Sequence, residues 1–197
     1  MVYKHKKGDY ISSILRSKKT VFSFKDIALL WGNSGSAVRV RVSYYVKNAQ
    51  LYPIRRGFYA KDKNYDKIEL ATKIFTPAYV SFETVLAREG IIFQYYSQIF
   101  VASYLTRDIT CDGQIYSYKK IKDLVLTDGA GITNNGECSI ATKERAFLDT
   151  IYINKDYHFD NLSPLDWDKV FVMVPMYSNK RMAQKVKNIH DNFQAKK

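Results

Sequence analysis

The segment over residues 32–47, GNSGSAVRVRVSYYVK, constrains the fold of this 197-residue chain more than any other. Its small polar start is typical of a turn that caps a helix. At about 100° per residue, the apolar side of the following helix comprises Val38, Val42, Tyr45 and Ala49. The opposite side comprises Ser36, Arg39, Ser43 and Lys47, with Val40 among them. The pattern predicts a helix that packs on one side and presents a basic, serine-rich surface on the other.

The charge around this helix is one-sided. From Ser34 to Lys61 there are six Lys or Arg and no Asp or Glu, whereas an ordinary surface helix balances its charges at neighbouring turns. Residues 1–63 hold 14 basic against 3 acidic residues, and residues 64–197 hold 17 against 16. Nearly all of the net charge of +12 therefore lies in the first third of the chain, as expected for a nucleic-acid-binding module beside a neutral one. A basic membrane-surface patch is the weaker alternative, because the charges are spread over several elements.

The elements around this helix predict a winged helix-turn-helix over residues 8–62. The first helix is expected over about 9–17, and its apolar stripe comprises Ile11, Ile14 and Leu15. The second is expected over about 24–31, with Ser23 as its cap and with Ile27, Leu30 and Trp31 facing inward. Two strand-like runs, 51–54 and 58–60, then flank the turn Arg55-Arg56-Gly57, which is typical of a wing with two arginines at its tip. A three-helix core with an incidental hairpin and a solvated basic face is the alternative.

A helix with this composition is suited to a DNA groove. The residues expected to contact double-stranded DNA are Lys25, Ser34, Ser36, Arg39, Val40, Arg41, Ser43, Lys47, Arg55 and Arg56. We expect Arg39 to reach base edges, and Arg55 and Arg56 to hold the phosphate backbone. Residues 1–8 form a basic arm that either contacts DNA or is a solvated, frayed terminus.

The remainder, residues 64–197, is predicted to be an α+β domain with helices on a small antiparallel sheet. Helices are expected over about 67–74, 82–89, 143–152, 165–173 and 178–193. Strands are expected within 99–105, 114–118, 121–126 and 136–140. Ser81 and Thr142 are the expected N-caps of the helices that follow them.

Two motifs in this domain resemble those of a known family. The segment 79–90, YVSFETVLAREG, is similar to the Y-hydrophobic-S-x-x-[ST]-[AV]-L-x-x-x-G signature of AbiEi-type antitoxins, and 141–149, ATKERAFLD, resembles their A-T-P-E-R-A-hydrophobic-hydrophobic-D motif. With the wing residues, the likeness spans most of the chain up to about residue 153. Lys143 replaces the usual proline, and Glu89 stands where a histidine is common.

The resemblance implies an antitoxin that represses its own operon and neutralises a nucleotidyltransferase toxin. The partners implied are double-stranded operator DNA, with inverted repeats as one arrangement, and the toxin. A stand-alone regulator or interaction module without a toxin is the alternative. The motif residues with a role either in the scaffold or in an interaction surface are Ser81, Thr84, Thr142, Lys143, Glu144, Arg145 and Asp149. On residue chemistry alone, Arg145 and Asp149 form an i,i+4 pair and Glu144 favours the helix dipole, which indicates a scaffold.

A nuclease fused to a DNA-binding domain is the rival from another class. Metal-dependent nucleases need acidic groups that converge on Mg²⁺. The acidic candidates, scattered over predicted loops and strands, are Asp108, Asp112, Asp128 and Glu137. We therefore expect no enzymatic activity, no catalytic residue, no metal and no cofactor.

Two further observations bear on the compartment. The two cysteines, Cys111 and Cys138, have neither pairing nor metal-ligand spacing, which is typical of a reduced intracellular protein. No apolar run approaches the length of a membrane span, and the N-terminal residues lack an apolar signal core. We expect a cytoplasmic protein.

Overall fold

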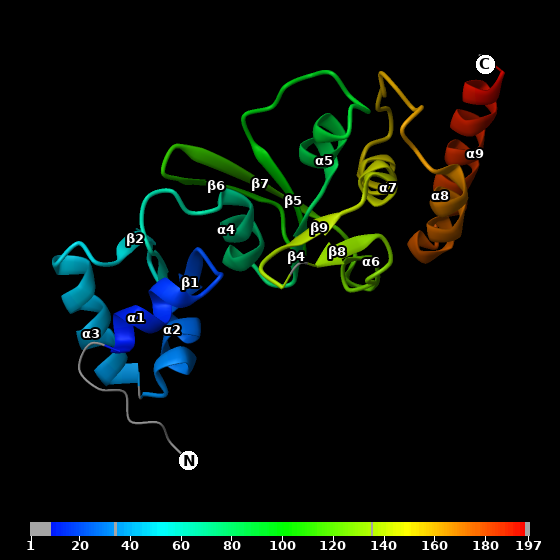
Figure 1. The fold of residues 1–197 in the computed structure, drawn as a ribbon. Coiled ribbons are helices and arrows are strands. Elements are labelled where there is room, and N and C mark those ends of the chain that lie inside the picture. Colours follow the sequence, from blue (N-terminus) through cyan, green and yellow to red (C-terminus); the bar gives the residue numbers. More distant parts are fainter. Residues whose placement is uncertain (1–8, 34, 135, 196–197) are drawn as a thin grey trace. The chain divides into compact units, whose positions relative to one another are not determined.

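The computed structural model describes residues 9–33, 35–134 and 136–195 (Figure 1). The chain divides into two compact units, residues 1–70 and 71–197. The boundary falls inside helix α4 (Lys67–Ile74), whereas the sequence places it at 63/64. The predicted basic arm, 1–8, and the predicted contact Ser34 lie outside the described residues.

Three helices and a small sheet build the first unit. In chain order, its elements before α4 are α1 (Asp9–Arg16), β1 (Val21–Ser23), α2 (Phe24–Trp31), α3 (Gly35–Lys47), β2 (Tyr52–Arg55) and β3 (Phe58–Ala60). The strands form an antiparallel sheet in the order β1-β3-β2, with Val21 and Tyr52 both opposite Ala60. Strand β1 was not predicted, because it has only three residues and no hairpin turn joins it to its partner β3. The buried core comprises Ile14, Phe22, Ile27, Trp31, Val38, Val42, Tyr45 and Leu51.

Local capping sets the limits of α2. The Ser23 Oγ accepts a hydrogen bond from the Asp26 backbone N–H at 3.1 Å, and Asp26 Oδ2 accepts from the Ser23 N–H at 2.8 Å. This reciprocal pair is a capping box, so the predicted Ser23 cap is confirmed. Gly32 ends the helix with φ of 61°, a left-handed conformation that glycine adopts at little cost.

Three apolar assignments in this unit were wrong. Ala49 is not on the buried side of α3, because the helix ends at Lys47 and Ala49 is exposed with φ of 53°. Leu15 and Leu30 are 54% and 38% exposed, since α1 and α2 are each only eight residues long and bury a narrow stripe.

The second unit is built on a six-stranded sheet in the order β6-β7-β5-β4-β9-β8. Its strands are β4 (Ala78–Val80), β5 (Ile99–Ser103), β6 (Arg107–Cys111), β7 (Gln114–Lys120), β8 (Ile132–Asn134) and β9 (Ser139–Ala141). The sheet is mixed, not antiparallel as predicted, because β5 pairs with β7 and β4 with β9 in parallel. β6 lies between β5 and β7 in the chain, and β4 and β9 are far apart in sequence, so no hairpin pattern reveals either pairing.

The helical elements described in this unit after α4 are α5 (Phe82–Arg88), α6 (Asp123–Leu126), α7 (Lys143–Ile153), α8 (Trp167–Met173), the 3-10 turn η1 (Val174–Tyr177) and α9 (Lys180–Gln194). The strand predicted over 121–126 is a helical turn instead. Val125 and Leu126 are both buried while Leu124 is 86% exposed, which fits a turn of helix and not a strand's alternation.

The faces of the sheet follow from the alternation of side chains along its strands. Tyr79 of β4 bonds Asp149 of α7, and Lys119 of β7 pairs with Glu83 of α5, so α5 and α7 cover one face. Tyr118, on the other side of β7, donates to the Ala71 carbonyl of α4 at 2.7 Å. Helices α5 and α7 lie side by side, with α8 next to α7 (Figure 1).

Within the described part of the chain, no helix has the length and apolar character needed to cross a membrane.

Candidate nucleic-acid interface

Helix α3 has the two-sided character that its sequence predicts. Val38, Val42 and Tyr45 are buried on the side that faces α1 and α2. The exposed side chains along the helix include Ser36, Arg39, Val40, Ser43 and Lys47. The burial of one side fixes the rotation of the helix, so the other side is held outward as a continuous surface of hydroxyl, basic and apolar groups.

A groove of about 720 Å³ separates α3 from the β2–β3 hairpin. Its lining comprises Phe24, Arg39, Val42, Ser43, Val46, Pro53, Arg56, Gly57 and Tyr59. Arg39, from the helix, lies 5.9 Å from the ring centre of Phe24, and Arg56 comes from the hairpin turn. Gly57 has φ of 83°, which permits the tight turn that brings Arg56 to this place. Two guanidinium groups from different elements therefore line one groove, which suits it to a phosphate backbone.

The hairpin turn presents its two arginines differently. Arg56 is exposed, whereas Arg55 is partly buried. Among the described residues, Nη1 of Arg55 is one of the buried nitrogens without a hydrogen-bond partner. Of the two, Arg56 is the one that lines the groove.

Arg41 is placed apart from the groove, against the aromatic core of the unit. Its guanidinium carbon lies 3.6 Å from the ring centre of Tyr10 and 5.9 Å from that of Trp31. This arrangement is a cation–π contact that ties α3 to α1 and α2. Arg41 was predicted to contact DNA; its partial burial against Tyr10 and Trp31 also gives it a structural role. Lys25, on α2, is exposed but does not line the groove.

Sequence reasoning missed the aromatic support behind α3. Trp31 Nε1 donates a hydrogen bond to the Tyr10 carbonyl at 2.8 Å, and its ring meets those of Tyr10 and Tyr45 edge to face at 5.5 and 5.9 Å. Such pairs stabilise a core beyond the area that they bury. Their sequence signal is the presence of large aromatics on all three helices, but the pairing depends on tertiary contacts.

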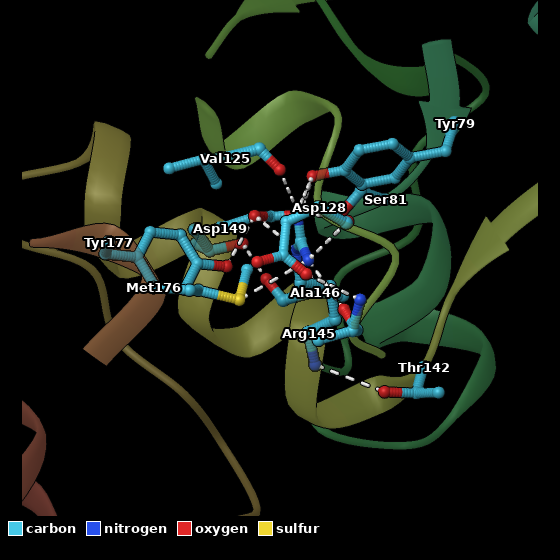
Figure 2. Close-up of polar contacts among 12 residues, drawn as sticks. Tyr79, Ser81, Val125, Asp128, Thr142, Arg145, Ala146, Asp149, Met176 and Tyr177 are labelled. Carbon is cyan, nitrogen blue, oxygen red and sulfur yellow. Dashed lines mark hydrogen bonds and ion pairs between the residues drawn. The ribbon is translucent and has the colours of Figure 1, made fainter. Parts of the chain in front are cut away.

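The second unit contains a buried polar cluster centred on Arg145 and Asp149 of α7 (Figure 2). Both side chains are fully buried, and Arg145 Nε lies 3.2 Å from Asp149 Oδ1. Asp149 also accepts hydrogen bonds from the hydroxyls of Ser81, Tyr79 and Tyr177, at 2.7, 3.0 and 2.6 Å. The carboxylate thus joins α7 to β4, to the residue before α5 and to η1.

The guanidinium of Arg145 is satisfied by main-chain oxygens as well. It donates to the Ala130 carbonyl at 2.6 Å. It also donates to the Val125 carbonyl at 2.6 Å and to the Tyr79 hydroxyl at 2.9 Å (Figure 2). Gly131 lies directly beside it, because a Cβ there would approach Arg145 Cβ to 2.9 Å and Met173 Sδ to 2.5 Å. Arg145 therefore positions the segment between α6 and β8 on the core.

Burial dominates the proton equilibria of this cluster. It raises the pKa of Tyr79 and of Tyr177 far above the ordinary value of 10, and the neighbouring Asp149 carboxylate raises both further. Burial also raises the pKa of Asp149, against the opposing effects of Arg145 and the three hydroxyls. Burial lowers the pKa of Arg145, but Asp149, Tyr79 and Tyr177 together outweigh it, so the pKa is raised overall. The tyrosines are thus held as neutral hydrogen-bond donors.

The other motif residues occupy structural positions too. The Thr142 cap is confirmed, with Oγ1 accepting from the Arg145 N–H at 3.3 Å. Ser81 occupies the predicted N-cap position of α5, but the expected capping hydrogen bond is absent, because its hydroxyl turns to Asp149. Thr84 Oγ1 accepts from the Phe100 N–H at 2.7 Å, and the buried Glu144 accepts from the Asp166 N–H at 3.3 Å. Lys143 is partly exposed, with one third of its side chain accessible.

The acidic candidates for a nuclease site are engaged separately. Asp108 accepts from the Ser117 hydroxyl at 2.7 Å, and Asp128 from the Ala130 N–H at 2.9 Å. Asp112 lies in the β6–β7 turn, and Glu137 lines a different surface hollow with Thr72 and Ser139. Among the residues that the structure describes, no three His, Cys, Asp or Glu side chains come together in a way that could hold a metal ion.

Comparison with known proteins adds no relative: no protein-family model matches the chain, and a search of curated proteins found no significant match.

Proposed function

We propose that the first unit is a winged helix-turn-helix that binds double-stranded DNA, and that the protein is a sequence-specific transcription regulator. The observation that carries this proposal is the groove that Arg39 of α3 and Arg56 of the hairpin both line, beside the exposed side of α3. The element order α1-β1-α2-α3-β2-β3 agrees with a winged helix, in which α3 is the recognition helix and the hairpin is the wing.

The geometry suggests how the duplex is held. The exposed side of α3 enters the major groove, and one strand of the backbone passes through the groove between α3 and the wing. A guanidinium group binds phosphate oxygens in a pair of parallel hydrogen bonds, so Arg56 holds this strand and fixes the register of the helix, while Arg39 on α3 reaches a base edge. Because these contacts release condensed counterions, binding weakens steeply as salt increases.

Binding of the full-length chain to labelled duplexes, followed by fluorescence anisotropy, tests the proposal. Arg39→Ala should relax sequence preference, whereas the Arg55→Ala, Arg56→Ala double variant should weaken binding to all duplexes alike. Arg181→Ala is the matched control, because Arg181 is an exposed arginine on α9 of the other unit. Equal binding by all four proteins, or no binding by the unaltered protein, would refute the proposal.

The resemblance of the segments 79–90 and 141–149 to AbiEi-type antitoxins supports a narrower role, repression of the protein's own operon and neutralisation of a nucleotidyltransferase toxin. Arg145, Asp149 and Ser81 are buried in their unit, so their part in this role is to position the helices that carry exposed residues. Co-expression of the full chain with the product of the adjacent gene tests it. Rescue of growth supports the antitoxin role, and Lys143→Glu should weaken rescue more than it weakens folding. A neighbouring gene that is harmless when expressed alone would leave a regulator without a toxin.

A further inference from the structure

Val40 is an exposed aliphatic side chain on the side of α3 that carries Ser36, Ser43 and Lys47. It is 74% exposed, and its neighbours one turn away on α3 are Ser36 and Ala37 before it and Ser43 and Tyr44 after it, all of them exposed. Lys47 continues the same row after a second turn. The buried side of the helix, with Val38, Val42 and Tyr45, lies opposite. Val40 thus points away from the core, outward with the hydroxyl and ammonium groups.

The fold gains nothing from a valine at this position. A β-branched residue at an exposed helix site costs helix stability relative to alanine, because its side chain loses χ1 freedom against the preceding turn. Since Val40 is mostly exposed, little apolar area is buried in compensation. Single exposed apolar residues are common on protein surfaces. This one differs in that it lies at the centre of the side of α3 that the proposed function directs at DNA.

The major groove offers one apolar group to such a side chain. Each base pair presents hydrogen-bond donors and acceptors there, and only thymine adds a methyl group, at C5 of the ring. Resting on the proposed DNA-binding function, we propose that Val40 is a specificity residue that contacts the C5-methyl group of a thymine, with Ser36 and Ser43 beside it. The operator then carries a thymine at the position that meets the first two turns of α3.

Replacement of thymine by deoxyuridine isolates this contact, because it removes the methyl group and leaves every hydrogen-bonding atom in place. The full-length protein is first used to select a preferred duplex from a random library. Each thymine of that duplex is then replaced singly by deoxyuridine, and the dissociation constants are compared. The unaltered protein should bind about fourfold more weakly at one thymine per recognition helix, the factor expected for one buried methyl-sized group.

The variant Val40→Ala should bind the thymine and deoxyuridine duplexes equally, with its weakening confined to the thymine duplex. Val172→Ala is the matched control, since Val172 is a helical valine that is 79% exposed on α8 of the other unit, and it should discriminate as the unaltered protein does. Alanine favours the helix at least as well as valine, so Val40→Ala should fold, and circular dichroism checks this.

The outcomes separate this inference from the function on which it rests. A protein that selects a duplex but shows no thymine sensitive to deoxyuridine, or a Val40→Ala variant that still discriminates, overturns the methyl contact and leaves DNA binding intact. A library that yields no preferred sequence overturns the contact and, with it, the sequence-specific part of the proposed function. A protein that binds no duplex at all refutes the proposed function, and the contact with it.

Discussion

Replacement of Asp149 by alanine is expected to destabilise the second unit more than any surface change. Its buried carboxylate is the common acceptor of the Arg145 Nε–H and of the hydroxyls of Ser81, Tyr79 and Tyr177. Without it, the guanidinium of Arg145 remains in the core as a charge without a counter-ion, and three hydroxyl groups have no acceptor. The alanine side chain restores none of these contacts.

The contacts set the size of the effect. Removal of one partner from a buried ion pair costs about 3–5 kcal/mol. Each buried hydroxyl that is deprived of its acceptor costs about 1 kcal/mol more, less whatever new partners it finds. We expect the free energy of unfolding to fall by about 6 kcal/mol, the lower end of this sum. With a denaturant dependence of about 2 kcal/mol per molar urea, the unfolding midpoint should fall by about 3 M.

Tryptophan fluorescence during urea unfolding measures this change in the unit concerned. The chain has 2 tryptophans, so a Trp31→Phe background leaves Trp167 as the only reporter. Trp167 lies in the second unit, with its ring 5.8 Å from that of Phe147 on α7. Lys169→Ala is the control, because it breaks an exposed ion pair with Asp166 at 3.0 Å, and surface pairs contribute little to stability.

A double-mutant cycle tests the cause. Arg145→Met alone also leaves a buried charge unpaired, the carboxylate of Asp149. The double variant Arg145→Met, Asp149→Ala leaves neither charge, so its destabilisation should be smaller than the sum for the two single variants. The reasoning is refuted if the two effects simply add, or if Asp149→Ala lowers the midpoint no more than Lys169→Ala does.

Three further predictions concern capping, pH and salt. Ser23→Ala removes the capping box of α2 and should lower the stability of the first unit by about 1 kcal/mol, measured by thermal unfolding. The pKa values of Tyr79 and Tyr177 are raised above 10 in the folded protein. Above pH 10 these tyrosines lose their protons in the unfolded chain but keep them in the folded one, so the free energy of unfolding should fall as the pH rises. The free energy of unfolding should fall by about 1.4 kcal/mol per pH unit for each of the two tyrosines. This decline should become shallower in Tyr79→Phe or Tyr177→Phe. It should not change in Tyr95→Phe, whose side chain is 87% exposed. Finally, the slope of log affinity against log salt should fall by about 1 for each phosphate contact that Arg55→Ala or Arg56→Ala removes; unchanged slopes would exclude these arginines from binding the backbone.

The sequence alone determined most of the local structure of the first unit; the exceptions are β1 and the exposure of Leu15, Leu30 and Ala49. Helix α3 and the β2–β3 hairpin were predictable because their causes lie within a few residues: an apolar repeat of one helical turn and a glycine at a tight turn. The start of α2 was predictable in the same way, from a capping serine three residues before an aspartate. The exposed basic side of α3 follows from its apolar repeat, because the burial of Val38, Val42 and Tyr45 fixes the rotation of the helix.

Only the tertiary structure decided what depends on partners distant in the chain. The parallel pairings β5–β7 and β4–β9 join segments that no hairpin connects, so the sheet's mixed order was not visible locally. Ser81 has the sequence context of an N-cap, but a buried carboxylate 68 residues away is the stronger acceptor and takes its hydroxyl. Nothing near Arg39 in the sequence indicates that it shares a groove with Arg56, because that groove exists only when the hairpin folds beside α3.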